Sequence, residues 1–157
     1  MEIRLVKKGF RFYFRLACQL KRVQNVTGVN SQIDPDTHFL MWDFDDVPLP
    51  VVKKSLRWVQ ETFNLPNIII LRTKQNGYHG YCFKACSFLE ARGIIAFTPN
   101  VDKHYIALGI GRGYFTLRFT DVKGREFQKV CTLRSDVPDD LTYKDVNCFV
   151  QYTKALK

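Results

Sequence analysis

Residues 38–46 read His-Phe-Leu-Met-Trp-Asp-Phe-Asp-Asp, an apolar run that ends in acids. An apolar run of this length predicts a buried β-strand. Because the side chains of a strand alternate between its two faces, Asp43 and Asp45 should project from the same face. Two such carboxylates can hold one or two divalent cations against phosphate oxygens. The acids could instead be solvated loop residues, one of them capping the next helix.

The composition predicts one domain, over residues 1–157, that binds a polyanion. The chain has 24 Lys and Arg against 15 Asp and Glu, which gives a formal net charge of +9. Its 157 residues can bury a core without disulfides or metals. Aromatic residues make up 14% of the chain. Cations interleaved with aromatic rings suit single-stranded nucleic acid, because the charges follow the backbone while the bases stack on the rings.

Neither a membrane span nor a signal peptide is expected. No apolar run approaches the roughly 20 residues that cross a bilayer, and basic residues interrupt the apolar runs near the N-terminus. The five cysteines are odd in number and scattered, which favours reduced thiols and a cytoplasmic location. His79, Cys82 and Cys86 lack a further pair of residues to complete a zinc site, so buried thiols are the better interpretation.

Hydrophobic periodicity predicts strands interrupted by two helices. The clearest helix spans residues 49–63, where apolar residues recur at gaps of three and four after an entrance at Pro48 and Pro50. A capping box at Ser87 and Glu90 opens a second helix, which Gly93 ends. The predicted strands cover residues 10–17, 39–45, 68–71, 78–84, 104–110, 114–120 and 126–133.

The connections complete the predicted fold. Residues 24–37 are rich in turn-forming side chains and should form a loop. Glycines at 109, 111 and 113 lack the strand–glycine–helix context of a dinucleotide site, so we predict a hairpin there. Residues 141–156 could form a strand or a helix. This order of elements predicts an α+β fold with a mainly antiparallel sheet.

Three segments carry residues suited to phosphoryl transfer. Asp43 and Asp45 end one strand, and His79 follows a basic turn over residues 72–77. A third acid, Asp102, precedes the predicted strand that holds Arg118. Carboxylates can hold two metal ions about 4 Å apart, so that one activates a hydroxyl and both stabilise the transferring phosphoryl group. Histidine and basic side chains can bind a triphosphate.

The order of these segments resembles the catalytic core of the archaeo-eukaryotic primase superfamily, the primase–polymerases. The family's first motif, a hydrophobic strand ending in Asp-x-Asp/Glu, is similar to residues 41–45. Its second, small-x-His after a Ser-Gly-basic turn, is similar to residues 73–81. Its third, a hydrophobic residue and an acid followed by a strand with Arg and then Lys-Gly, is similar to residues 101–102, 115–118 and 123–124. The likeness covers residues 39–124.

The resemblance implies a primase-type nucleotidyltransferase that uses Mg²⁺ or Mn²⁺, nucleoside triphosphates and a single-stranded DNA or RNA template. It also implies a sheet like that of an RNA-recognition motif, with two or three flanking helices. A helicase or a second replication subunit is the expected partner, in the cytoplasm or nucleoid, or in the host cytosol for a phage or plasmid protein. The implied site residues are Asp43, Asp45 and Asp102 for catalysis and metal binding, His79, Lys74, Arg118 and Lys123 for the nucleotide, and Arg72, Arg112 and Tyr81 for nucleic acid.

The chain also departs from the family's pattern. Thr73 stands where the family often has Ser, and the length leaves little room for its N-terminal subdomain. Asp121 is an alternative third acid, although Asp102 fits better because the Arg118 strand follows it. Two other functions stay open. One is a module that binds single strands without catalysis, and the other is a metal-dependent nuclease that uses the same acids.

Overall fold

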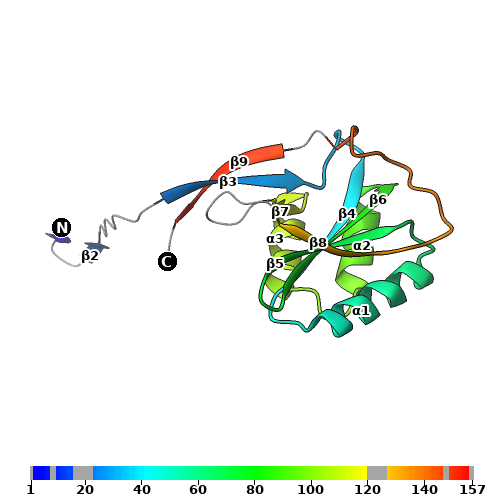
Figure 1. Cartoon of the computed structure of the whole chain (residues 1–157). Helices are drawn as coiled ribbons and strands as arrows, with labels where there is room; N and C mark the ends of the chain where they lie inside the picture. The colour runs from blue at the N-terminus through cyan, green and yellow to red at the C-terminus, as the bar shows by residue number, and fades with distance from the viewer. Residues whose placement is uncertain (1, 8–9, 16–22, 120–126, 147–148, 156–157) are drawn as a thin grey trace.

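The computed structural model describes residues 2–7, 10–15, 23–119, 127–146 and 149–155 (Figure 1). All strand pairings among these residues are antiparallel. No helix in the described part of the chain has the length and apolar character to cross a membrane. The elements are, in order, β1 Glu2–Lys7, β2 Phe10–Arg15, β3 Val23–Asn30, β4 His38–Phe44, α1 Leu49–Thr62, β5 Ile68–Lys74, β6 Gly77–Cys86, α2 Phe88–Phe97, α3 Lys103–Arg112, β7 Thr116–Arg118, β8 Gln128–Leu133 and β9 Phe149–Ala155.

A four-stranded sheet in the order β4-β6-β5-β8 forms the centre of the fold (Figure 1). Helix α1 connects β4 to β5, and β6 lies between these two strands, which is the split β-α-β arrangement of ferredoxin-like folds. A four-stranded sheet is also the core of the RNA-recognition motif. The strands predicted over residues 39–45, 68–71, 78–84 and 126–133 correspond to β4, β5, β6 and β8. The predicted α+β fold with mainly antiparallel pairing is confirmed.

One face of this sheet holds the main hydrophobic core. Trp42 and Phe44 of β4 point to it and are fully buried. Trp42 donates its indole N–H to the hydroxyl of Thr98, at the end of α2, over 2.9 Å. Helix α1 approaches Gly80 of β6 so closely that an added Cβ would lie 3.2 Å from Leu56. Helices α1 and α2 therefore cover this face, and the side chains of the opposite face, Asp43 among them, point away from the helices.

Helix α1 forms where the sequence predicts it. Pro48 is its N-cap and Pro50 lies in its first turn, where the missing backbone N–H of proline costs no hydrogen bond. The helix ends at Thr62, and the chain turns at Asn64 with a φ of 50°. Its apolar stripe packs on the sheet through three fully buried side chains, those of Val52, Leu56 and Val59.

A second, three-stranded sheet has the order β7-β3-β9. Figure 1 shows β3 and β9 side by side, running away from the four-stranded sheet. The prediction of a loop over residues 24–37 is wrong up to Asn30, because these residues belong to β3. Valines recur at every third position of β3, so the strand has no local period of two. It forms because β7 and β9 pair with its two edges, which is a non-local contact.

The strands predicted elsewhere in the chain agree in part with the structure. Strand β2 corresponds to the strand predicted over residues 10–17 and pairs with β1 in a separate two-stranded sheet. The strand predicted over 114–120 is shorter, since β7 comprises only Thr116–Arg118. Within the tail, 141–156, the structure places a strand, β9.

The strand predicted over residues 104–110 is wrong, because these residues form helix α3. Asp102 caps this helix through Oδ1, which accepts the backbone N–H of Tyr105 over 2.8 Å. Gly113 ends it in the left-handed conformation, with a φ of 81°. The predicted glycine hairpin is therefore also wrong. Gly109 serves packing inside the helix, since an added Cβ would lie 2.2 Å from the ring of Phe115.

Helix α2 begins as predicted but ends later. The hydroxyl of Ser87 accepts the backbone N–H of Glu90 over 3.2 Å, as the capping box requires. The helix continues past Gly93 and ends at Phe97, with Thr98 as its extended C-cap. Pro99 explains this end, because a proline ring disfavours the helical conformation of the residue before it.

Candidate active site at the end of strands β4 and β6

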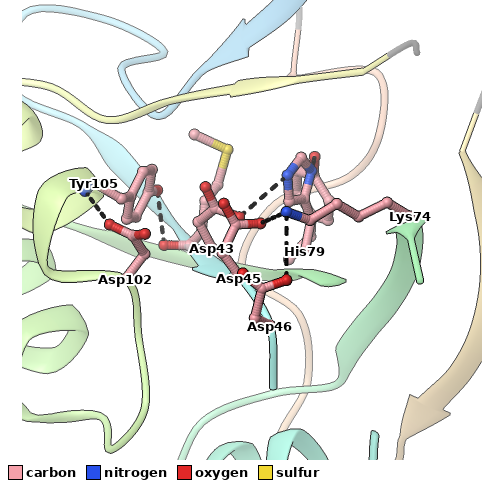
Figure 2. Close-up of polar contacts among 9 residues, drawn as sticks. Asp43, Asp45, Asp46, Lys74, His79, Asp102 and Tyr105 are labelled. Carbon is pink, nitrogen blue, oxygen red and sulfur yellow. Dashed lines mark hydrogen bonds and ion pairs between the residues drawn. The ribbon is translucent and has the colours of Figure 1, made fainter. Parts of the chain in front are cut away.

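Asp43 and His79 meet on the face of the sheet that the helices leave uncovered. The two residues are directly opposed in the β4–β6 ladder, so their side chains share a face. Nε2 of His79 lies 3.5 Å from Oδ1 of Asp43 (Figure 2). The His79 side chain is 4% exposed and that of Asp43 is 24% exposed, so the pair is accessible from the carboxylate side.

Lys74 brings a positive charge to the same place. Its Nζ lies 3.1 Å from Oδ1 of Asp45 and 3.7 Å from Oδ1 of Asp46 (Figure 2). The turn between β5 and β6 is tied to the loop after β4 by a hydrogen bond from the N–H of Val47 to the carbonyl of Asn76, over 3.0 Å. These connections hold the basic turn against the acids. The side chain of Lys74 is nevertheless 49% exposed.

Asp102 lies beside this cluster at the start of α3. Its backbone N–H donates to the carbonyl of Asp43 over 2.9 Å, which anchors the α2–α3 connection to β4. The hydroxyl of Tyr105, one turn into α3, donates to the carbonyl of Met41 over 3.0 Å (Figure 2). Helix α3 is thus fixed along β4, with the carboxylate of Asp102 next to that of Asp43.

The surroundings of Asp43 raise its pKa to about 7. Burial is the largest cause, because it disfavours the charged form, and the negative charges of Asp45 and Asp102 act in the same direction. The positive charges of Arg118 and Lys74 partly oppose the shift. Three carboxylates therefore share one electrostatic environment, and near neutral pH Asp43 exchanges between its neutral and charged forms.

His79 remains neutral in the same environment. Burial lowers its pKa to about 3, and the positive charge of Arg118 lowers it further, while a hydrogen bond with the backbone of Arg118 opposes the shift. The 3.5 Å contact with Asp43 is therefore not an ion pair at neutral pH. On the other side of the ring, Nδ1 of His79 lies 3.3 Å from the hydroxyl of Tyr81.

The carboxylates of Asp43 and Asp45 could hold a divalent cation. Within the described residues, no group of three or more His, Cys, Asp or Glu side chains is arranged to hold a metal ion alone. Mg²⁺ commonly keeps several waters and is bound by one or two carboxylates together with substrate phosphates. The arrangement therefore suits a cation that arrives with a phosphate ligand better than one enclosed by protein.

Of the other predicted site residues, Tyr81 lies beside His79, whereas Arg72 and Arg112 lie away from the acids. Arg72 pairs with Tyr78 in the β5–β6 ladder and lies over its ring, 5.9 Å from the centroid, so it is on the face opposite His79. Arg112 is exposed in the last turn of α3. Tyr81 is buried beside His79. Lys123 and the alternative acid Asp121 lie outside the described residues.

An apolar pocket of about 440 Å³ opens on the same face of the sheet. Tyr81 and Phe127 belong both to its wall and to the surroundings of His79, since the Phe127 ring meets the imidazole edge-on with 5.4 Å between centroids. Lys129 is the charged residue of its lining. The lining comprises Val29, Phe39, Ile69, Leu71, Tyr81, Phe83, Phe119, Phe127, Lys129, Tyr143 and Val146.

Sequence reasoning missed this pocket, although a signal for it was present. Near the pocket, strands β4, β5 and β6 are apolar on both faces. Phe39, Ile69 and Phe83 are examples on the face that points away from the helices. A strand that is apolar on both faces indicates a second layer of structure above the sheet. The nearby thiols take no part in the site: Cys82 and Cys86 are buried, and burial raises the pKa of each to about 12.

Comparison of the chain with protein-family models, with curated proteins and with solved structures finds no match. The functional interpretation therefore depends on the residues of the site and on their geometry.

Proposed function

We propose that this chain is a template-directed nucleotidyltransferase of the primase–polymerase type. The observation that carries the proposal is the contact between Asp43 and His79, which come from different sequence motifs and meet over 3.5 Å on one face of the sheet. Asp45 and Lys74 lie beside them. Residues of the first and second motifs thus meet at one end of the sheet, as a phosphoryl-transfer site would require.

The donor set fits Mg²⁺ or Mn²⁺ bound together with a nucleoside triphosphate. Asp43 and Asp45 would hold the cation, with Asp102 as the neighbouring third acid, because carboxylate oxygens are the ligands these ions prefer. Burial and the negative charges of Asp45 and Asp102 raise the pKa of Asp43, and a bound cation would oppose this shift by favouring the charged carboxylate. When bound, such an ion activates the attacking hydroxyl and stabilises the transferring phosphoryl group.

Two other side chains would bind the triphosphate, and His79 would position the acid beside them. Lys74 now contacts Asp45 and is half exposed, so phosphate oxygens can replace that carboxylate as its partner. Arg118 can present its planar guanidinium to two phosphate oxygens at once. His79, buried and held neutral, would position the Asp43 carboxyl group without adding a charge beside it.

The apolar pocket lies on the same face of the sheet as Asp43 and His79, and its aromatic rings support a role in holding bases. Rings stack on bases regardless of sequence, which suits a template-directed enzyme that must accept each base. The template would be single-stranded DNA or RNA, drawn by the net charge of +9. We further propose a cytoplasmic or nucleoid location and a replication partner, such as a helicase or a second subunit.

One observation favours a binding module without catalysis as the second candidate. The carboxylate of Asp102 already caps α3, and Asp45 already pairs with Lys74, so both acids have structural roles that need no chemistry. In that case the basic and aromatic surface would bind single strands, and the acid cluster would only join α3 and the β5–β6 turn to the sheet.

A primer-synthesis assay tests the proposal. The protein is incubated with a single-stranded template, labelled ribo- or deoxynucleotides, and Mn²⁺ or Mg²⁺, and the products are resolved by length. We expect wild-type protein to extend chains, and the Asp43→Asn and Asp45→Asn variants to lose at least about 100-fold of this activity, which corresponds to the loss of charge stabilisation in the transition state. Asp136→Asn, an exposed acid on a different segment, is the matched control and should keep full activity.

Three other results of this assay would each contradict the proposal in a different way. No product from wild-type protein with either cation, although it binds the template, would show that the chain is a binding module. Shortening of the template would show a nuclease. Equal activity of Asp43→Asn and Asp136→Asn would mean that the acid cluster is not the active site.

A further inference from the structure

Three aromatic rings form a patch on the outer surface of helices α1 and α2. Trp58, Phe63 and Phe97 are 41%, 38% and 56% exposed. The rings of Trp58 and Phe97 stack with 5.1 Å between centroids, and Phe63 meets Phe97 edge-on at 5.7 Å. We call these three residues the aromatic patch. Large apolar side chains gathered on a surface commonly mark an interaction site.

Helix α2 extends this surface toward its N-terminus. Leu89, Gly93 and Phe97 are spaced by four residues, so they follow one stripe of the helix. Leu89 is 64% exposed. An added Cβ at Gly93 would meet no atom within 4 Å, so the glycine is not required by packing within the described chain. Because Gly93 has no side chain, there is space for a partner between Leu89 and Phe97.

The charges beside the patch are self-complementary. Lys54 and Glu61 are exposed on α1, four residues before and three residues after Trp58. With 3.6 residues per turn they lie on one side of the helix, about 6 Å and about 4.5 Å from Trp58 along the axis. Within the part of the chain that the structure describes, neither has an ion-pair partner.

We propose that the aromatic patch joins two copies of this chain into a symmetric dimer in which the two α1 helices run antiparallel. A two-fold axis through the Trp58 contact places Lys54 of each copy beside Glu61 of the other, and Trp58 against its equivalent. A parallel arrangement would instead set like charges against one another. The opposite charges of Lys54 and Glu61 therefore offset, at the interface, the repulsion that the overall charge of +9 would cause.

The position of the patch is compatible with the candidate active site. Helices α1 and α2 cover the Trp42 face of the sheet, whereas Asp43 and His79 lie on the opposite face. A dimer formed through these helices would leave both acid clusters accessible. The inference does not depend on the proposed function, because the contact involves none of the site residues.

Charge reversal tests the arrangement with full-length protein. Sedimentation velocity between about 5 µM and about 500 µM should show wild-type protein passing from monomer to dimer, which is the range of a weak, transient association. Lys54→Glu alone and Glu61→Lys alone should each weaken association by at least about tenfold, because both cross-contacts become like-charged. The double variant Lys54→Glu with Glu61→Lys should restore it.

Fluorescence gives an independent measurement of the same contact. Trp42 is fully buried, so a concentration-dependent blue shift of emission would report Trp58 leaving water. Leu108→Ser, which removes an exposed apolar side chain from α3 outside the patch, is the control and should associate like wild type. The proposal is overturned if wild-type protein stays monomeric over this range, or if the single charge variants dimerise as well as wild type.

Discussion

Asp43 and His79 are neighbours whose pKa values shift in opposite directions for one main reason. Burial disfavours the charged form of each, so the pKa of the acid rises to about 7 and that of the imidazole falls to about 3. As the pH falls, the carboxyl group of Asp43 is therefore protonated before the imidazole ring of His79. Near pH 7 Asp43 can change its charge in response to a ligand, whereas His79 remains neutral.

The shift at Asp43 predicts a stability difference that depends on pH. The carboxyl has a higher pKa in the folded chain, about 7, than its ordinary value of 3.8. Its contribution to stability is fully present below pH 3.8 and is lost as the pH rises toward 7. Asp43→Asn carries no charge and should therefore be more stable than wild type at pH 8, by up to ~4 kcal/mol. Urea denaturation in buffer without divalent cations measures the difference.

The comparison with wild type isolates Asp43. Protonation of His79 destabilises the fold as the pH falls below its ordinary pKa of 6.5, but it does so in both proteins and largely cancels. The gap between the variant and wild type should close by about pH 4, and Mg²⁺ should narrow it at pH 8 if wild-type Asp43 binds the cation. A gap that is constant from pH 4 to pH 8 would contradict the shifted pKa.

At the scale of secondary-structure elements, Asp102 combines two roles that substitutions can separate. It caps α3 through Oδ1, and its charge raises the pKa of Asp43. Asparagine caps helices as well as aspartate does, whereas alanine does not. The two substitutions at this position therefore distinguish the loss of charge from the loss of the cap.

We expect Asp102→Asn to keep the stability of wild type and to lose nucleotide incorporation. Asp102→Ala should lose incorporation and also about 1 kcal/mol of stability, because the N–H of Tyr105 loses its acceptor. Thermal unfolding and the primer-synthesis assay measure the two properties in parallel. If Asp102→Asn were fully active, Asp102 would be a helix cap alone and the third acid would have to be sought elsewhere.

Two glycines in the helices should respond oppositely to alanine. At Gly109 the new Cβ would lie 2.2 Å from the Phe115 ring, and relieving this overlap should cost about 1–3 kcal/mol. At Gly93 the Cβ meets nothing within 4 Å, so the higher helix propensity of alanine should add about 0.5–1 kcal/mol. Denaturant unfolding of the two variants measures both signs. A stabilising Gly109→Ala would contradict the close packing of α3.

The elements that sequence predicted correctly are those whose signal is local. Helix α1 has a period of 3.6, prolines at its start and a stop near Asn64, and β4 is an apolar run before acids. Helix α3 was missed because Gly109 has low helix propensity, and its reason, close packing against the Phe115 ring, is not contained in the hydrophobic period. Strand β3 was missed because its hydrogen-bond partners, β7 and β9, are far along the chain.

For the candidate site, too, local patterns predicted some features and non-local contacts determined the others. Alternation along β4 predicted that Asp43 points away from the core. The order of the motifs predicted that His79 lies near Asp43, and the two residues are directly opposed in the β4–β6 ladder. Arg72 was expected to contact nucleic acid, and the ladder puts it on the face opposite His79, beside Tyr78. The apolar pocket forms between the two sheets. Apolar residues on both faces of β4, β5 and β6 indicate a second layer there, but they do not indicate which segment forms it.

At the scale of the whole molecule, the central sheet separates two surfaces with different chemistry. Its Trp42 face is covered by α1 and α2, whose outer side carries the aromatic patch. Its Asp43 face holds the acids, His79 and the apolar pocket. Nucleic acid and nucleotide would therefore approach one side of the molecule, and a second copy of the chain the other.

The net charge of +9 predicts salt-dependent binding of single strands that does not require the acids. A labelled oligonucleotide should bind wild-type protein, and its affinity should fall on the order of tenfold between about 0.1 M and about 0.3 M salt, if about three phosphates are neutralised. Asp43→Asn with Asp45→Asn should bind at least as tightly, since two negative charges are removed, while incorporating no nucleotides. Fluorescence anisotropy measures the binding. If the double variant lost binding and incorporation together, the acids would support the binding surface rather than the chemistry, and the enzyme proposal would fail.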